Sequence, residues 1–594
     1  MAADTKPFGG SFLVHDVQPD DVVTPEDLGE EERMLIQALE DFAERQVAPH
    51  MDELDKGNAD IGRRLFQEAA ELGVFMVEVP EEFGGLDLNV LAITGMCSVR
   101  SKLGSLASFV FTHQGIGMLP LVNFATPEQR ERYLEPAMNG EILSAFALTE
   151  PGTGSDAMNI TTRAELDEAG THYVLNGAKQ WITNAGHADI FIVFAKVDGE
   201  HFTAFIMERD TPGLSIGANE RLLGQHGTSV AALQLEDVEI PVENLLGEIG
   251  KGHKVAFCTL NVGRLKLATY AAGGAVGAVE VAGKYAAERH QFGRPIGDFG
   301  MIQRKLADMA ARAYMAEAVA YRAAGLVYHA LETKAGEGRP SLDDKLAMLS
   351  EFSSECAMAK VLASEAYNHL SDEAIQVFGG YGYSEEYAPA HMYRDSRITR
   401  IYEGTNEICR LYAQRALMKR AWRGKLDFAG ASESPQADGA SADDMGFDGL
   451  HARIGDLKQV YLYLVGVVNG AVDQDRMFEP ENQQLVASLS DVAIEIFGAE
   501  SAVLRAEKAV AAGAEHGALV EALARLAFAR AADRVRQEAN EILAAVSDAE
   551  ELRARLADIA AWMPLPAGLV DTRRLVARAV LEHGGLPTGD LQPA

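Results

Sequence analysis

The stretch QVFGGYGYSEEY at residues 376–387, followed by RDSRITRIYEGTNEICR at 394–410, mixes small, aromatic and charged residues where a plain helical core would be apolar. GGYG is not a GxGxxG dinucleotide turn, because no strand–turn–helix unit is expected around it. Glu403 lies between Tyr402 and Gly404, at the start of an expected helix. Two interpretations stay open from position alone: a carboxylate favoured by the helix dipole, or an acid with a chemical role.

Arginines stand out upstream because the protein is otherwise acidic. GR at 263–264 and ERHQFGRP at 288–295 supply Arg264, Arg289 and Arg294. Arg264 and Arg289 are 25 residues apart, which is seven turns at 3.6 residues per turn, so one continuous helix would present both on one face. Two guanidinium groups on one face bind pyrophosphate well. The alternative is a pair of surface arginines joined to Asp or Glu.

Two further segments carry small or polar residues in unusual places. FALTEPGTGSDA, residues 146–157, offers backbone N–H groups and close approach at its glycines, which suits a phosphate or a flat polar ring. QWITNAG, residues 180–186, puts a Trp beside a Thr and an Asn at a strand end, where the indole can stack on an aromatic cofactor. A Pro-Gly turn and ordinary packing are the respective alternatives.

The order of patterns predicts several units. Residues 25–143 are expected to be helical, with a Thr cap and first-turn Pro in ATPEQRERYLEPAM. Residues 144–248 are expected to form a small antiparallel β domain, in which Asn176-Gly177 indicates a hairpin. Helices are expected again over 249–424, then a linker over 425–449 rich in Ala, Ser, Asp and Gly, and a further helical unit over 450–594.

Composition limits the class of protein. The formal net charge of −35 disfavours a nucleic-acid partner, because a phosphate backbone would be repelled. The four cysteines form no CxxC pair, which argues against a disulfide framework or a cysteine-based metal site. No secretory signal and no run of 18 apolar residues is visible, so we expect a cytoplasmic protein.

Five segments in this order resemble motifs of the acyl-CoA dehydrogenase family: TEPGTGSD, KQWITNAG, ERHQFGRPI, QVFGGYGY and IYEGTNEI. The resemblance covers roughly residues 30–420 and implies that family's fold. This fold has a helical N-terminal domain, an antiparallel β domain and a helical bundle; here a C-terminal helical domain is appended. GHKVAFCTLNVGRLKLA and the appended unit most resemble the very-long-chain branch.

The resemblance implies FAD as cofactor, held between the β domain and the second helical domain, and no metal. It assigns to the flavin and its tail the positions Phe146, Leu148, Thr149, Gly154, Ser155, Trp181, Thr183, Arg289, Gln291, Phe292, Gln376, Gly380, Thr405 and Glu407. Of these, Gln376 and Gly380 would come from a neighbouring subunit.

For the substrate, the resemblance implies contacts to acyl-CoA from Ser155, Asn261, Arg264, Tyr402 and Gly404. It makes Glu403 the base that removes the α-proton, while the β-hydrogen leaves as hydride. In the isovaleryl-type branch the base precedes the equivalent of Arg264; that position is Gly263 here, which cannot act as a base. Asn261 departs from the Asp expected in the medium-chain branch.

The implied reaction is long-chain acyl-CoA dehydrogenation in β-oxidation, with an electron-transferring flavoprotein as electron acceptor. The alternatives are an acyl-CoA oxidase and a dehydrogenase for branched or short acyl groups. Ser108 and Thr112, four residues apart and on one face if helical, would leave a deep acyl slot, or are small for helix packing. The C-terminal unit implies a homodimer; peripheral membrane contact through KQVYLYLVGVVNGAV is the less favoured alternative.

Overall fold

A computed structural model describes residues 7–335, 340–428, 445–564 and 566–587. The chain forms two compact units. One, the sheet unit, is Glu30–Lys266; the other, the helical unit, joins Met1–Gly29 to Leu267–Ala594. Within the expected linker 425–449, residues 429–444 lie outside the described residues.

The sheet unit begins with short helices packed around one apolar core. They are α1 (Glu30–Phe42), α2 (Met51–Asp55), α3 (Ala59–Glu71), α4 (Val90–Val99), α5 (Ser105–Thr112), α6 (Leu119–Phe124), α7 (Pro127–Gln129) and α8 (Glu135–Met138). The predicted Thr cap is confirmed, because the Thr126 hydroxyl accepts the Gln129 N–H at 3.2 Å. The segment 105–124 is apolar enough to span a membrane by composition, yet 89% of it is buried in the protein, which accounts for its apolar character.

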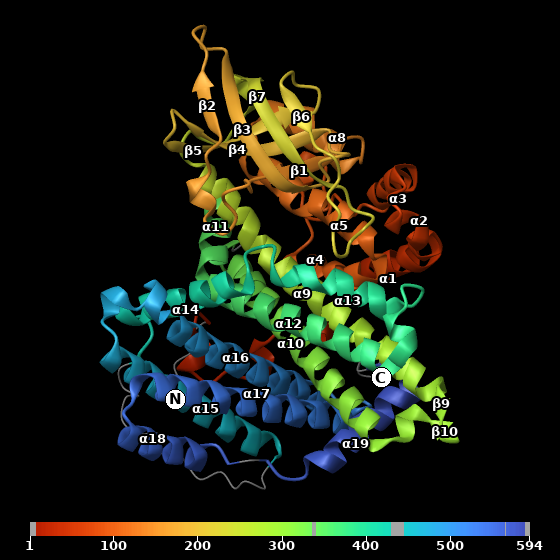
Figure 1. Ribbon diagram of the computed structural model, residues 1–594, viewed down its shortest axis with the longest axis vertical. Helices are drawn as coiled ribbons and strands as arrows, with labels where there is room; N and C mark the ends of the chain where they lie inside the picture. Colours follow the sequence, from red (N-terminus) through yellow and green to blue (C-terminus); the bar gives the residue numbers. More distant parts are fainter. Residues whose placement is uncertain (1–6, 336–339, 429–444, 565, 588–594) are drawn as a thin grey trace. The chain divides into compact units, whose positions relative to one another are not determined.

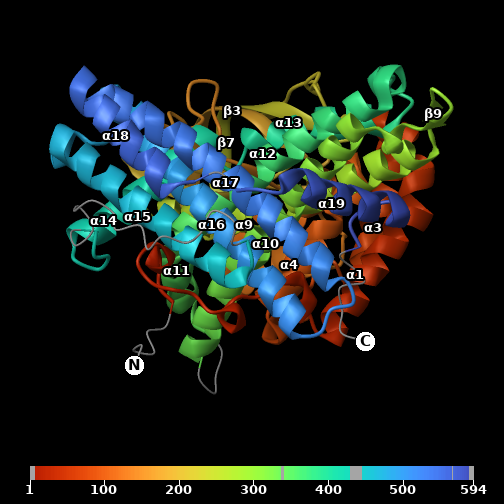
Figure 2. The same cartoon turned by 90° about the horizontal axis from the view of Figure 1, so that it is seen from below.

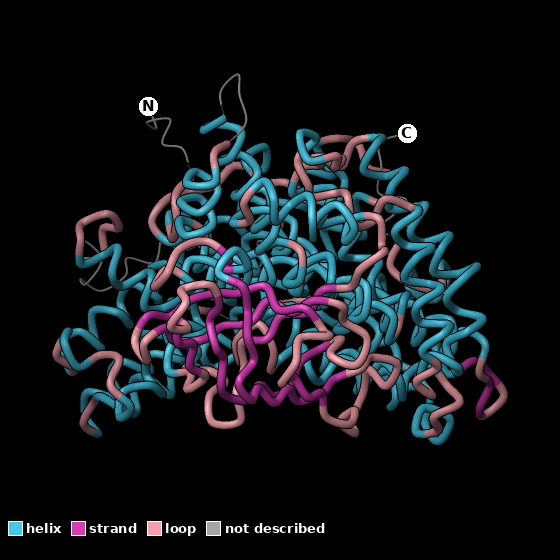
Figure 3. The backbone as a smooth tube through the Cα atoms, turned by 90° about the horizontal axis from the view of Figure 1, so that it is seen from above, coloured by secondary structure: helices cyan, strands magenta, loops and turns pink. Residues whose placement is uncertain are grey.

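An eight-stranded sheet follows (Figures 1 and 3). Its strands are β1 (Ser144–Ala147), β2 (Arg163–Leu166), β3 (His172–Thr183), β4 (Ile190–Val197), β5 (His201–Glu208), β6 (Leu214–Ile216), β7 (Val230–Pro241) and β8 (Leu245–Leu246). The order is β6-β7-β3-β2-β4-β5-β8, with β1 on β4. Most pairs are antiparallel, as expected, but β1 and β2 both run parallel to β4. Strand β4 is buried along nearly its whole length, as a central strand should be.

The hairpin predicted at Asn176-Gly177 is wrong. Both residues lie inside the single strand β3, at an irregularity in its pairing with β7. A Cβ at Gly177 would stand 2.5 Å from the Thr162 hydroxyl, so glycine is required here for close approach rather than for a turn. Asn176 instead bonds to Asp237 on β7, its side-chain oxygen accepting the Asp237 N–H at 2.9 Å. An Asn-Gly step thus marks a β-bulge in this chain.

The helical unit is built from long helices (Figures 1 and 2). Helix α9 (Gly252–Glu288) starts within the sheet unit's residues and is followed by a small hairpin of β9 (His290–Gln291) and β10 (Arg294–Pro295). Then come α10 (Gly300–Ala335), α11 (Leu342–Glu351), α12 (Ser353–Phe378), α13 (Ala388–Arg397), α14 (Asn406–Trp422), α15 (Phe447–Ala471), α16 (Gln483–Ala511), α17 (Gly517–Val546), α18 (Ala549–Trp562) and α19 (Leu569–His583). Helix α16 packs against α17 and also against α10, α12 and α14.

The C-terminal helices therefore cover a face of the bundle formed by α10, α12 and α14. Buried charges join the two sets: Arg322 of α10 contacts Glu500 of α16 at 2.7 Å, with both side chains 4% exposed. KQVYLYLVGVVNGAV forms the second half of α15, and its Val460, Tyr461 and Leu464 are buried. The segment is a core helix, and the expected fold class is confirmed.

Candidate functional site

The glycine-containing loop after β1 has buried roots and an exposed tip. Phe146 and Leu148 are buried in the sheet unit, whereas Gly154 and Ser155 are exposed and Thr149 is half-buried. A Cβ added at Gly154 would meet no atom within 4 Å, so the backbone at the tip is open to a ligand. The Thr149 carbonyl accepts the Gln180 N–H at 2.9 Å, which ties this loop to β3.

A buried ion pair fixes the same junction. Lys179 Nζ lies 2.8 Å from Glu150 Oε1, with side chains 0% and 2% exposed. The Glu150 carboxylate also accepts the N–H and hydroxyl groups of Thr161 and Thr162 at 2.5–3.0 Å. Burial alone raises the pKa of Glu150, but Lys179 and the threonines outweigh it and hold this pKa to about 2. Sequence patterns do not indicate this pair, apart from its position beside the glycines and Trp181.

Trp181 and Thr183 lie at the end of β3, where the pairing with β7 shifts between Lys179 and Ile182. The bulge re-aims the indole, which is 56% exposed, and puts Trp181 in the left-handed region at φ 59°. Thr183 is half-buried beside it. An exposed indole held rigidly at a bulge is suited to stacking on a planar ring.

Asn261 and Arg264 lie one turn apart on α9. The Arg264 guanidinium donates to Asn261 Oδ1 at 3.0 Å, and Arg264 is 7% exposed. Lys266, two residues on, forms a buried ion pair with Glu78, and Gln114 hydrogen-bonds to both. The predicted CoA contacts thus stand beside a second buried charge cluster that the sequence did not mark.

Arg289 follows α9 directly, but its surroundings differ from those of Arg264. Arg289 is exposed and its guanidinium carbon lies 5.5 Å from the ring centre of Tyr381. Gln291 and Arg294 pair across the β9–β10 hairpin, and Phe292-Gly293 forms its two-residue turn with φ 52° and 81°. Both positive values fit a type I′ turn, in which Phe is uncommon. The Phe292 side chain is 91% exposed, so the hairpin presents an aromatic ring next to Arg289 and Arg294.

Gln376 and Gly380 stand at the end of α12. Gln376 is exposed, and α12 ends at Phe378 with Gly379 as its C-cap, whose φ of 63° suits glycine. No atom lies within 4 Å of a Cβ added at Gly380, whereas one at Gly382 would press on the Ile375 carbonyl at 2.5 Å. The GGYG stretch is thus a short turn with an open outer surface.

The turn that carries Glu403 precedes α14 rather than starting it. The helix begins at Asn406 with Thr405 as its cap, and the exposed Glu407 lies in its first turn. Glu403 and Gly404 are both left-handed, at φ 58° and 85°. Tyr402, Glu403 and Gly404 are half-buried.

A buried cation holds this turn from below. Lys360 of α12 is fully buried, and its ammonium donates to the Gly404 carbonyl at 2.8 Å and to Asn406 Oδ1 at 2.7 Å. Asn406 in turn donates to Ser364 and Glu365 on α12. The sequence did not identify Lys360, because a Lys in an Ala-rich helical run predicts an exposed side chain.

Backbone strain concentrates at the predicted site. Among the described residues, eight other than glycine have positive φ, and five of these are Asn, Asp or Gln. The remaining three are Trp181, Phe292 and Glu403, each of which the sequence had marked for the cofactor or the base. Bulky residues are held in this region at a cost of roughly 1–3 kcal/mol each and cluster at functional sites. The strain supports the choice of these residues on grounds independent of motif resemblance.

The residues present suit FAD. The sheet unit supplies an exposed indole at Trp181 and an open backbone at Gly154, while the helical unit supplies exposed rings at Phe292 and Tyr381 beside Arg289. Aromatic faces suit an isoalloxazine or adenine ring, and a guanidinium suits pyrophosphate.

Four family models match the chain. They are the acyl-CoA dehydrogenase N-terminal domain over residues 29–141, the middle domain over 145–238, and two different models named acyl-CoA dehydrogenase, C-terminal domain, over 250–418 and 456–560.

Known proteins agree with these models. A probable acyl-CoA dehydrogenase of Bacillus subtilis is 38% identical and covers 98% of both chains. The short-chain specific acyl-CoA dehydrogenase of rat mitochondria is 39% identical over 65% of this chain and 89% of its own length. The crystal structure of an acyl-CoA dehydrogenase complexed with FAD from Bacillus anthracis is 39% identical, covers 98% of this chain and 99% of that one, and superposes with a TM-score of 0.93. The protein is an FAD-dependent oxidoreductase that belongs to the acyl-CoA dehydrogenase family.

Proposed function

We propose that the protein converts long-chain acyl-CoA to trans-2-enoyl-CoA in fatty-acid β-oxidation, with Glu403 as the base. The observation that carries this proposal is the Glu403 turn: a carboxylate in a left-handed conformation, half-buried, with the next carbonyl held by buried Lys360. A general base must point at the proton that it removes, and this turn fixes the direction of the Glu403 carboxylate.

Apart from Glu403, the side chains of the site mainly have to align the substrate. The α-proton of the thioester passes to the Glu403 carboxylate, and the electron pair left on Cα forms the double bond to Cβ. When bound, FAD supplies the two-electron acceptor for the hydride that leaves Cβ. The Glu403 N–H polarises the thioester carbonyl, which lowers the barrier to proton removal. Arg264, oriented by Asn261, and Ser155 hold the CoA portion.

Two features support a long acyl chain. The region 450–594, whose residues 456–560 match a family model of their own, is the part in which this chain resembles the very-long-chain branch. Ser108 and Thr112 both lie on α5, as the expected helix requires, and both have small side chains.

A short acyl chain is the second candidate, because relatives named short-chain specific are 38–39% identical over 65–66% of this chain. The dependence of flavin bleaching on acyl-chain length, described below, distinguishes the long-chain from the short-chain candidate.

We propose an electron-transferring flavoprotein as electron acceptor, a homodimer as the assembly and the cytoplasm as the location. The dimer is supported by the packing of α16 on α10, α12 and α14, because the chain itself covers this face of the bundle. Gln376 and Gly380 are exposed in the single chain, as residues that meet a neighbour's cofactor should be.

The test is to mix the FAD-bound protein anaerobically with saturated acyl-CoAs of increasing length. The visible absorbance of the flavin is monitored during the reaction. We expect bleaching that is fastest with long chains. A maximum at four carbons would transfer the proposal to the short-chain candidate, and a flavin that no acyl-CoA bleaches would overturn it. Peroxide release at a rate equal to turnover under air would instead identify an oxidase.

A further inference from the structure

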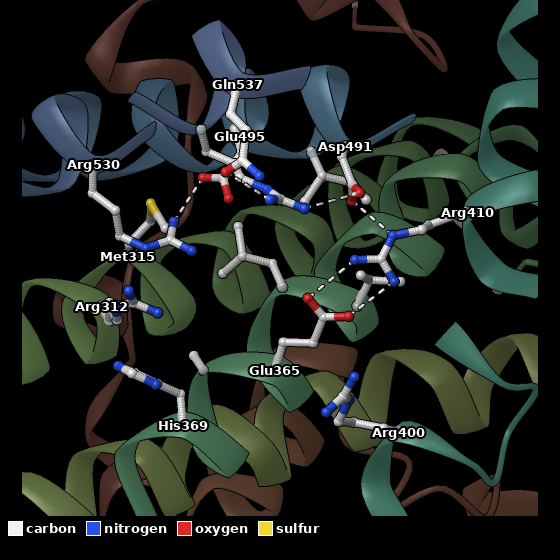
Figure 4. Close-up of a pocket in the computed structure, with 15 residues that line it drawn as sticks. Arg312, Met315, Glu365, His369, Arg400, Arg410, Asp491, Glu495, Arg530 and Gln537 are labelled. Carbon is white, nitrogen blue, oxygen red and sulfur yellow. Dashed lines mark hydrogen bonds and ion pairs between the residues drawn. The ribbon is translucent and has the colours of Figure 1, made fainter. Parts of the chain in front are cut away.

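A charged cavity lies in the helical unit, and none of its lining residues is among the ligand contacts considered so far. Its volume is about 390 Å³, and residues of α10, α12, the Arg400 turn, α14, α16 and α17 line it (Figure 4). Five arginines line it: Arg312, Arg400, Arg410, Arg530 and Arg534. We call it the arginine cavity.

The carboxylates in its wall are already committed. Arg410 contacts Glu365 at 2.8 Å and Asp491 at 2.7 Å, and Arg530 contacts Glu495 at 2.7 Å. A fourth carboxylate, Glu538, contacts Arg534 at 2.8 Å. Five arginines thus face four carboxylates, and the positive charges outnumber the negative charges by one when His369 is neutral. All five arginines are partly buried, and an unpaired cation in such surroundings favours a counter-charge.

The excess is concentrated on one side. Within the described part of the chain, Arg312 makes no hydrogen bond or ion pair, and the ring nitrogens of His369 make no hydrogen bond. Arg530 Nε and Arg400 Nε are buried and meet no acceptor. Figure 4 shows Arg312 between Arg530 and His369, with all three side chains at the same side of the cavity.

Arg312 lies near enough to Arg530 and His369 for their positive charges to repel one another. Burial, followed by the charge of Arg530, lowers the pKa of Arg312 to about 10. Burial, followed by the charge of Arg312, also lowers the pKa of His369. Three acids offset the charge of Arg312, and each has another partner. Glu495 contacts Arg530 at 2.7 Å, Asp308 contacts Arg573 at 2.8 Å, and Glu373 pairs with Lys305. In the part of the chain that the structure describes, no carboxylate lies within ion-pair distance of Arg312.

We propose that the arginine cavity binds a phosphate-type dianion between Arg312, Arg530 and His369. Guanidinium groups present paired N–H donors that match an oxyanion, and among the described residues no carboxylate forms an ion pair with Arg312. The polar wall excludes an acyl chain as occupant. The volume admits either inorganic phosphate or the phosphate of a small phosphomonoester. Residues from α16 and α17 complete the wall, which gives the C-terminal helices a role in ligand binding as well as packing.

The binding test is calorimetric titration of the FAD-bound full chain with inorganic phosphate and, separately, with adenosine monophosphate, at ionic strength held constant with chloride. We expect Arg312→Met to weaken binding by about tenfold or more, because one charge-assisted contact of this kind is lost. Arg304→Met is the matched control: the same helix and charge change, but an exposed side chain at 71% that pairs with Asp308. It should leave the affinity unchanged.

Tighter binding of phosphate would identify the free ion, and tighter binding of the nucleotide a phosphomonoester. Absence of saturable binding by both, or equal affinity in wild type and Arg312→Met, would overturn the proposal.

Thermal unfolding adds a readout that a purely structural arginine would not give. Without anion, Arg312→Met should unfold at the same temperature as wild type or higher, because a crowded cation is removed. With saturating anion, wild type should gain more than the variant. If the variant does not fold, His369→Gln serves in the same two measurements. An anion-independent loss of stability in both variants would also overturn the proposal.

Discussion

Two buried ion pairs, one in the sheet unit and one in the helical unit, have different roles. In the sheet unit, Lys179 and Glu150 join two segments 29 residues apart that the sequence had both marked for the flavin. In the helical unit, Arg505 of α16 joins Glu26 near the N-terminus, 479 residues away, and Glu317 of α10. The first kind of pair shapes a binding loop, while the second fixes which helices pack together.

The difference teaches how to interpret a buried ion pair. A pair beside strained backbone, such as Lys179 beside Trp181, holds a conformation that the local sequence would not keep by itself. A pair between helices distant in sequence, such as Arg322 and Glu500, lies on unstrained backbone and selects a partner. Loss of the first should alter ligand binding, and loss of the second should alter stability alone.

The largest effect should come from Glu403→Gln. The variant keeps the shape of the turn but cannot accept the proton, so we expect the rate of flavin reduction to fall roughly 100- to 10,000-fold. FAD content and unfolding temperature should match wild type. Stopped-flow flavin bleaching measures the rate, and more than a tenth of the wild-type rate would remove Glu403 from the role of base.

Next in size is Lys179→Met. It leaves the Glu150 carboxylate buried without its cation, which costs about 3–5 kcal/mol. We expect weaker FAD retention and faster hydrogen exchange in β3. Arg322→Met is the matched comparison: Glu500 keeps Lys458 at 2.6 Å, so the cost should be smaller and FAD retention unchanged. Equal FAD loss in the two variants would break the distinction between the units.

Lys360→Met should have a smaller effect on activity. It removes the donor to the Gly404 carbonyl while leaving the Glu403 carboxylate in place, and misplacement of a base typically costs roughly 10- to 100-fold in rate. The effect should fall on the rate of flavin reduction more than on substrate affinity. Lys345→Met, on α11, tests a general effect of charge loss and should retain the wild-type rate. Wild-type bleaching by Lys360→Met would show that the turn keeps its geometry unaided.

The smallest effect concerns pH and His113. The ring is fully buried, accepts the Ser144 N–H at 3.0 Å and reaches the Ala137 carbonyl at 3.1 Å. Burial lowers its pKa from 6.5 to about 3 in the folded protein. The unfolded chain therefore binds the extra proton between these values, so the contribution of His113 is complete above pH 6.5 and is lost as pH falls below it.

We expect a loss of about 1.4 kcal/mol per pH unit below 6.5. Hydrogen exchange of the amides of β1 measures this slope. In His113→Gln the dependence of stability on pH should fall by the contribution of one proton, about 1.4 kcal/mol per pH unit, because the ring that titrates is gone. An equal slope in wild type and variant would assign the titration to another group.

Local chemistry made part of the site predictable. Motif resemblance identified the Glu403 segment, the glycine loop and the Trp181 strand, and the Thr126 cap followed from side-chain geometry. The predicted Asn176-Gly177 hairpin was wrong because Thr162, 15 residues earlier in the chain, packs closely against Gly177 and determines its backbone conformation. Lys360 was missed because its burial depends on the packing of α12 against the turn before α14.

The sequence by itself determined the family, FAD as cofactor and the order of helical and strand-forming regions, because these rest on short motifs and on periodicity within single elements. Tertiary structure alone decided which charges are buried and which remain without a counter-charge. The arginine cavity takes Arg312 from α10, His369 from α12 and Arg530 from α17, positions up to 218 residues apart that no local pattern connects. A side chain's electrostatic surroundings are set by neighbours in space, and those neighbours exist only once the helices have packed.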